Sequence, residues 1–166
     1  MKQINPHHTL CIDAGNTSLS AGIWNGKHIS ASRKTSSSSD LVSLKKFFVS
    51  FKSFNISRCA ISSVAASRTA KFKTALKSVL SIPVSELKTR QFAHFLDTGI
   101  DIGKTGIDRV LGCYKASAGG RINSIVIDAG TAITIDVVYG GLFRGGVIIP
   151  GIEISRMSLA LHTERV

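Results

Sequence analysis

The chain has few cysteines and no clustered metal ligands, and this shortage excludes several kinds of site. Three cysteines stand apart among apolar neighbours, in no CxxC or Cys/His spacing: Cys11, Cys59 and Cys113. This pattern excludes a zinc ribbon or a disulfide framework and predicts buried, reduced thiols. The five histidines share no spacing either, so we expect neither metal binding nor general-base catalysis from them.

Long apolar runs are also absent. No stretch reaches the roughly 18 apolar residues that a membrane span requires, and residues 1–8 lack the apolar core and cleavage site of a signal peptide. The composition, 43% apolar and 19% charged, is that of an ordinary globular protein with a real core. We therefore expect a soluble cytoplasmic protein with no membrane partner.

Acidic residues are scarce relative to basic ones. The 21 Lys and Arg outnumber the 10 Asp and Glu, which gives a formal net charge of +11. The basic residues are spread along the chain and form no long run, which favours a solvated basic surface over a nucleic-acid-binding face. The same field would attract substrates that carry phosphates.

What the chain does contain is an internal repeat. Residues 10–17 (LCIDAGNT) are echoed by residues 124–131 (SIVIDAGT), so that an apolar strand delivers an Asp to a small-residue turn in each copy. Twelve residues beyond each Asp lies a hairpin dipeptide, Asn25-Gly26 or Gly140-Gly141. The repeat predicts two domains of the same topology, 1–118 and 119–166, with Gly119-Gly120 at the boundary and the second domain incomplete.

The segments between and after the repeats predict further elements. Residues 40–51 and 107–117 are typical of helices, residues 59–64 of a strand, and the spacing of Ile154, Met157 and Leu161 indicates a last helix. A helix capped by Ser67 is predicted to bury Phe72, Ala75, Leu76, Val79 and Leu80, and Trp24 is predicted to lie in the core.

A strand-end Asp followed by Gly and hydroxyl side chains suits nucleotide phosphates. The Gly lets backbone amides approach the phosphate oxygens, and the Asp can hold Mg²⁺ through water. Two such turns facing each other would grip phosphates from both sides, as in the actin, hexokinase and heat-shock chaperone superfamily. The predicted fold class is therefore α/β, with duplicated actin-like (ribonuclease-H-like) domains. The alternative is that both turns are only tight strand connections.

The motifs together resemble those of the type III pantothenate kinases, in family order along the whole chain. The matching segments are 13–17 (DAGNT), 61–64 (ISSV), 106–109 (GIDR), 128–134 (DAGTAIT) and 145–151 (GGVIIPG). The resemblance implies ATP-dependent phosphorylation of pantothenate, the first step of coenzyme A synthesis, with Mg²⁺ and a monovalent cation (K⁺ or NH₄⁺), by a homodimer.

The resemblance also assigns roles to residues. It implies that ATP is bound by Asp13, Ala14, Gly15, Asn16, Thr17, Ser18, Leu19, Ser20 and Thr131, and that pantothenate is bound by Gly106, Ile107, Asp108 and Arg109. Asp108 would act as the general base, Asp128 as the ligand of the monovalent cation, and Asp13 as a ligand of Mg²⁺ through water. Without the flanking motifs, Asp108-Arg109 would indicate only a helix N-terminal acid beside a surface cation.

The chain departs from the family pattern at three places. Ser20 replaces a common Lys, residues 98–105 lack the Tyr and Pro that usually precede the GxDR motif, and a substrate-contacting Thr of the family lies beyond the length of this sequence. Two other functions therefore stay open. One is phosphotransfer to a different acceptor; the other is a non-catalytic regulator, which salt-dependent binding to duplex DNA would support.

Overall fold

The computed structural model describes residues 8–118 and 122–163 and divides the chain into two compact units, Met1–Leu87 and Lys88–Val166. The predicted boundary dipeptide, Gly119-Gly120, lies outside the described residues. Residues 88–118, which the sequence places in the first domain, are grouped in the structure with the second sheet. The reason is that the helix of this segment shares a hydrophobic cluster with strands of that sheet.

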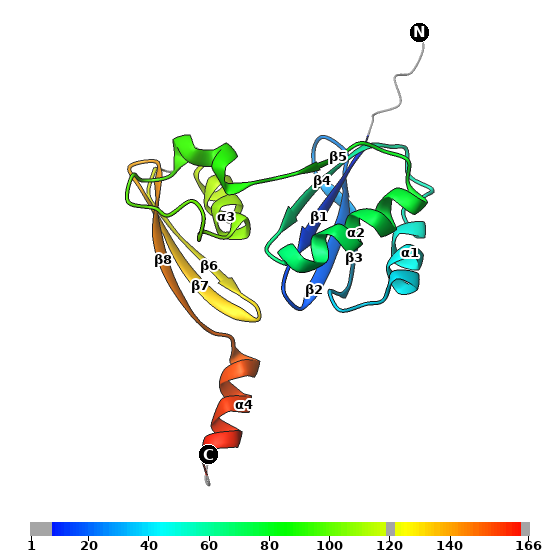
Figure 1. The fold of residues 1–166 in the computed structure, drawn as a ribbon. Helices are drawn as coiled ribbons and strands as arrows, with labels where there is room; N and C mark the ends of the chain where they lie inside the picture. The colour runs from blue at the N-terminus through cyan, green and yellow to red at the C-terminus, as the bar shows by residue number, and fades with distance from the viewer. Residues whose placement is uncertain (1–7, 119–121, 164–166) are drawn as a thin grey trace. The chain divides into compact units, whose positions relative to one another are not determined.

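The first unit is built on a mixed five-stranded sheet in the order β3-β2-β1-β4-β5 (Figure 1). The first three strands form an antiparallel meander, and β4 and β5 add in parallel to β1. The predicted hairpin at Asn25-Gly26 is confirmed, since Gly26 has a φ of 98° between two paired strands. The strands are β1 His8–Ala14, β2 Ser18–Trp24, β3 Ile29–Ser36, β4 Ile56–Ser63 and β5 Val84–Glu86.

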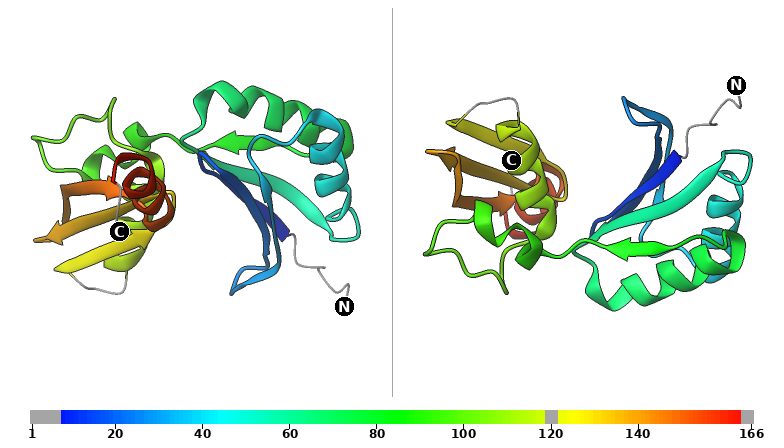
Figure 2. Two further views of the ribbon diagram at one scale, coloured as in Figure 1. Left: turned by 90° about the horizontal axis from the view of Figure 1, so that it is seen from below. Right: turned by 90° about the horizontal axis from the view of Figure 1, so that it is seen from above.

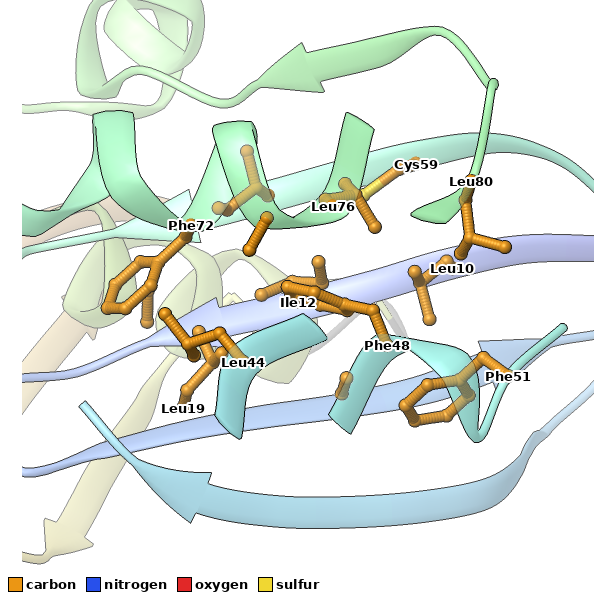
Figure 3. Packing of buried hydrophobic residues seen from close by; sticks show 14 of the residues in the cluster. Leu10, Ile12, Leu19, Leu44, Phe48, Phe51, Cys59, Phe72, Leu76 and Leu80 are labelled. Atoms are coloured by element: carbon orange, nitrogen blue, oxygen red, sulfur yellow. The ribbon is translucent and has the colours of Figure 1, made fainter. Parts of the chain in front are cut away.

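Two helices, α1 (Leu41–Val49) and α2 (Ala66–Val79), cover one face of this sheet (Figure 2). Alternate strand residues point toward them, because successive side chains of a strand face opposite sides. The core between sheet and helices is filled by aromatic and aliphatic side chains (Figure 3), among them Leu10, Ile12, Leu19, Leu44, Phe48, Phe51, Phe72 and Leu76. The outer face of β1 is thereby left free to carry polar groups.

Three local predictions in this unit need correction. Trp24 lies at the end of β2 with 37% of its surface exposed and is not part of the core. Ser67 does not cap α2, which begins at Ala66 after Ala65 and has no side-chain cap. Cys11 is only partly buried, because it lies on the sheet face opposite the helices, whereas Cys59 is buried beneath them.

The second unit contains a three-stranded antiparallel sheet in the order β6-β7-β8, formed by Ser124–Ala129, Ala132–Tyr139 and Leu142–Pro150. Helix α3 (Ile107–Ser117) has the predicted bounds and lies on one face of the sheet, with the 3-10 helix η1 (Thr89–Phe95) beside it (Figure 1). The small core of this unit consists of Phe95, Leu96, Val110, Cys113, Val138 and Phe143. The predicted hairpin at Gly140-Gly141 is confirmed, with φ values of 60° and 76°.

The other face of the second sheet is apolar and uncovered in the described part of the unit. Ile125 and Ile127 are 68% and 65% exposed, although their counterparts in the first repeat, Leu10 and Ile12, are 0% and 3% exposed. The last helix, α4 (Ile152–His162), follows β8 and buries none of its described residues. Among the described residues of this unit, no pair of helices corresponding to α1 and α2 covers this face of the sheet.

No helix within residues 8–118 and 122–163 is long and apolar enough to cross a lipid bilayer.

Candidate functional site

Asp13 stands at the end of β1, on the face opposite the two helices. It is exposed, and its register partners are Ser20 on β2 and Ser62 on β4. The hydroxyl of Ser62 donates to a carboxylate oxygen of Asp13 at 3.4 Å. The structure thus surrounds the strand-end carboxylate with hydroxyl groups, a set of oxygen atoms suited to a hard cation and its water ligands.

The turn after Asp13 is held by donors from outside the hairpin. The side chain of Ser37 donates to the carbonyl of Gly15 at 2.7 Å, and its amide donates to the carbonyl of Thr17 at 3.0 Å. The guanidinium of Arg68, on α2, donates to the carbonyl of Asn16 at 2.5 Å. Carbonyl oxygens repel phosphates, so engaging these three favours anion binding at the turn.

Sequence reasoning missed Ser37 and Arg68, because both are brought to the turn by tertiary contacts. Ser37 is fully buried although it lies in a serine-rich stretch that is typical of an exposed loop. Arg68 is 52 residues from Asn16 along the chain. Buried polar groups in proteins are almost always hydrogen-bonded, but the sequence alone does not reveal which hydroxyl will be buried.

The second turn, at the end of β6, has the same layout. Asp128 is exposed, and the amide of Gly130 closes the turn on the carbonyl of Ala132 at 2.9 Å. The amide of Gly151 donates to the carbonyl of Thr131 at 3.0 Å. A Cβ atom at Gly151 would lie 2.3 Å from the carbonyl oxygen of Gly130, so only glycine allows the chain to pass this close.

The first turn of α3 carries Asp108 and Arg109. A carboxylate oxygen of Asp108 accepts from the amide of Arg109 at 2.8 Å, and the residue is partly buried. The side chain of Arg109 forms an ion pair with Asp136 of β7, with Nε 3.0 and 3.1 Å from the two carboxylate oxygens. Hydrogen bonding to Asp136 raises the pKa of Arg109 above its usual value.

This ion pair gives Arg109 a partner that the sequence analysis did not name. Asp136 is 1% exposed, and the guanidinium also lies over the ring of Phe143, 5.8 Å from its centroid. The signal in the sequence is an acidic residue inside an apolar strand, ITIDVVY, since a buried charge requires a partner. Arg109 therefore joins α3 to the second sheet.

The strand register places Asp128 on the same face of this sheet as α3. Val126 and Asp136 are partners across β6 and β7, and both contact α3, through Gly112 and Arg109 respectively. Asp128 lies two residues beyond Val126 and therefore points to the same side. The structure thus gathers three sequence-predicted residues, Asp108, Arg109 and Asp128, on one side of a single sheet.

The oxygen atoms at the two turns suit hard cations better than transition metals. No cluster of three or more His, Cys, Asp or Glu side chains able to hold a metal ion occurs in the described ranges. Single carboxylates with neighbouring hydroxyls, as at Asp13 and Ser62, are typical of Mg²⁺ sites completed by water and by substrate phosphates.

Comparison with known proteins agrees with these features. The sequence model of the family described as type III pantothenate kinase matches residues 9–166. A type III pantothenate kinase from Thiobacillus denitrificans is 32% identical over 157 residues, which is 93% of this chain and 62% of that protein. The chain spans less than two thirds of the length of the curated relatives that it matches.

Solved structures show the fold. A Baf-family transcriptional activator from Campylobacter jejuni aligns with a TM-score of 0.60 at 20% identity, over 95% of this chain and 62% of the other. An exopolyphosphatase from Cytophaga hutchinsonii aligns with a TM-score of 0.51 at 14% identity, over 95% and 55%. The predicted α/β fold of the actin-like ATPases is therefore confirmed.

Proposed function

Because the chain belongs to the type III pantothenate kinase family, we propose that it transfers the γ-phosphate of ATP to pantothenate and yields 4'-phosphopantothenate in the cytoplasm. One observation carries this proposal: Asp108, in the first turn of α3, and Asp128, at the end of β6, lie on the same side of the second sheet. A proton acceptor and a strand-end carboxylate on one surface are what phosphoryl transfer to an alcohol requires.

In this proposal ATP is held by the two Asp-Ala-Gly turns. Asp13 to Ser20 form the first phosphate loop, and Thr131 contacts the nucleotide from the second turn. Two observations support this: the carbonyl oxygens of the first turn are engaged by protein donors, and Gly151 holds the second turn through a direct amide contact. Backbone amides and hydroxyls at such turns are suited to phosphate oxygens.

In this proposal Asp108 is the general base. Its carboxylate accepts the proton of the substrate hydroxyl while the hydroxyl oxygen forms a bond to the γ-phosphorus, and the bond from that phosphorus to the bridging oxygen of ADP breaks. Gly106, Ile107 and Arg109 contribute to the pantothenate site. Because the guanidinium of Arg109 is occupied by Asp136, its main contribution is to fix α3 and thereby the position of Asp108.

Two cations complete the proposed site. Asp13 would hold Mg²⁺ through water, and Asp128 would hold the monovalent cation, K⁺ or NH₄⁺. When bound, these ions neutralise charge on the β- and γ-phosphates. Both carboxylates are exposed at the ends of strands, which leaves room for hydrated ions. The resemblance also implies a homodimer, which sedimentation of the purified chain would measure.

A substrate panel tests the proposal. The purified chain is incubated with ATP, Mg²⁺ and K⁺ and either pantothenate or other small alcohols, and the phosphorylated product is identified by mass spectrometry. We expect transfer to pantothenate in preference to the other alcohols, lost when K⁺ is replaced by Na⁺. If the chain phosphorylated a different alcohol and not pantothenate, the proposed kinase activity would stand, but pantothenate would be excluded as its substrate.

A further inference from the structure

The first phosphate loop lacks a basic residue of its own. Residues 13–20 read DAGNTSLS, with one acidic and no basic side chain. A triphosphate bound here would add several negative charges next to Asp13, and like charges at this distance oppose each other. Mg²⁺ at Asp13 would offset part of this charge, and a basic side chain from another part of the chain would offset more of it.

Arg68 of α2 is placed to be that cation. Its Nη1 atom donates to the carbonyl of Asn16 at 2.5 Å, so the guanidinium lies at the middle of the turn. A guanidinium has five N–H donors in a planar fork, and among the described residues the bond to Asn16 is the one that Arg68 makes through its side chain. The remaining donors are available to a phosphate, for which the arginine fork is well suited.

The start of α2 is fixed by side chains, so Arg68 is held in place. The hydroxyls of Ser63 and Thr69 lie 2.7 Å apart, and Ser63 also accepts from the amide of Ala65 at 3.2 Å. One turn further along α2, Lys71 donates to the carbonyl of Ser39 at 2.5 Å. The first two turns of the helix are thus tied to β4 and to the segment after β3. A preordered donor loses less freedom when it binds.

We propose that Arg68 binds the polyphosphate of the nucleotide at the first loop and supplies the positive charge that residues 13–20 lack. This proposal rests on the proposed function, since it requires nucleotide binding at this loop. In the free protein Arg68 holds the carbonyl of Asn16; in the complex its other N–H groups contact phosphate oxygens.

The test compares nucleotide binding by Arg68→Gln, Arg68→Lys and Lys77→Gln with the wild-type chain, using calorimetry with Mg-ATP, AMP and inorganic tripolyphosphate. Lys77 is the matched control, because it is an exposed cation in the last turn of the same helix. Thermal unfolding of each variant shows whether the fold is retained. If Arg68→Gln does not fold, Arg68→Lys, which keeps the positive charge but loses the planar fork, provides the comparison.

We expect Arg68→Gln to weaken Mg-ATP and tripolyphosphate binding about tenfold and AMP binding much less, because the lost contact is with the distal phosphates. The affinity of Arg68→Lys for Mg-ATP should lie between those of the wild type and Arg68→Gln, and the affinity of Lys77→Gln should equal that of the wild type. The salt dependence of ATP binding should be smaller in Arg68→Gln than in the wild type. Equal ATP affinity in Arg68→Gln and the wild type, or an equal loss for ATP and AMP, overturns the inference. A wild-type chain that binds neither ATP nor tripolyphosphate overturns the proposed function together with it.

Discussion

Arg109 and Asp136 form an almost completely buried ion pair that joins α3 to β7, with side chains 14% and 2% exposed. The pair lies directly beside Asp108, the proposed base. Because α3 also contacts the sheet through Val110 and Cys113, the ion pair and the apolar cluster together set where the first turn of the helix lies. The position of Asp108 therefore depends on Asp136, a residue that has no proposed part in the reaction.

Replacing Asp136 with Asn should destabilise the second unit strongly. The change leaves Arg109 facing a neutral partner in a buried place, and breaking a buried pair by removing one charge costs roughly 3–5 kcal/mol. Urea unfolding, followed by hydrogen exchange of α3, measures the loss. Asp101→Asn, which affects an exposed loop carboxylate, is the control and should change stability little. A stable Asp136→Asn variant would contradict the structural role of the pair.

Equivalent positions of the repeat should respond differently to the same substitution. Ile12→Ala creates a cavity beneath α1 and α2 and should lower the free energy of unfolding by roughly 2–5 kcal/mol. Ile127→Ala removes a side chain that is 65% exposed and should cost about 0.5 kcal/mol or less. Thermal unfolding of both variants makes the comparison. Equal losses would mean that Ile127 is covered in solution.

Gly151→Ala should disturb the second turn. The new methyl group would lie 2.3 Å from one carbonyl oxygen and 2.5 Å from another, and both belong to the backbone of the turn. Gly130→Ala is a matched control, because its methyl group would meet nothing closer than 3.8 Å. We expect a lower melting temperature for Gly151→Ala alone. The same result for both variants would show that the turn is sensitive to any substitution.

The buried cysteines should resist alkylation at neutral pH. Burial raises the pKa of Cys59 to about 12 and that of Cys113 to about 11, from an ordinary value of 9.0, so little reactive thiolate is present. Cys11, partly exposed, should react first. Rapid modification of Cys59 in the folded chain would show that the first unit opens readily.

The same pKa shifts predict a loss of stability in alkaline solution. A thiol whose pKa is raised by folding stabilises the folded state fully below its unfolded pKa, and this contribution is lost as the pH rises. The free energy of unfolding should therefore fall between about pH 9 and pH 12. Cys59→Ala should reduce this fall, and an unchanged pH profile in that variant would assign the effect to other groups.

Much of the fold could be predicted from the sequence because the repeat is local. The apolar run before each Asp, the glycine dipeptides and the helical spacing of residues 107–117 depend on neighbours along the chain, and the structure confirms them. Tertiary contacts escaped prediction: the burial of Ser37, the reach of Arg68 to Asn16 and the partner of Arg109. Trp24 was misplaced because it directly follows the buried Ile23 and therefore faces the side of the sheet opposite the helices.

The most direct test of the proposed kinase is a single-turnover measurement of phosphate transfer from ATP to pantothenate, with Mg²⁺ and K⁺, by the wild-type chain and by Asp108→Asn. The account predicts transfer by the wild type and a rate at least roughly a hundredfold lower in Asp108→Asn, with unchanged stability, since a general base contributes about that much or more. Asp101→Asn should match the wild type. Equal rates in the wild type and Asp108→Asn, or no transfer by the wild type, would contradict it.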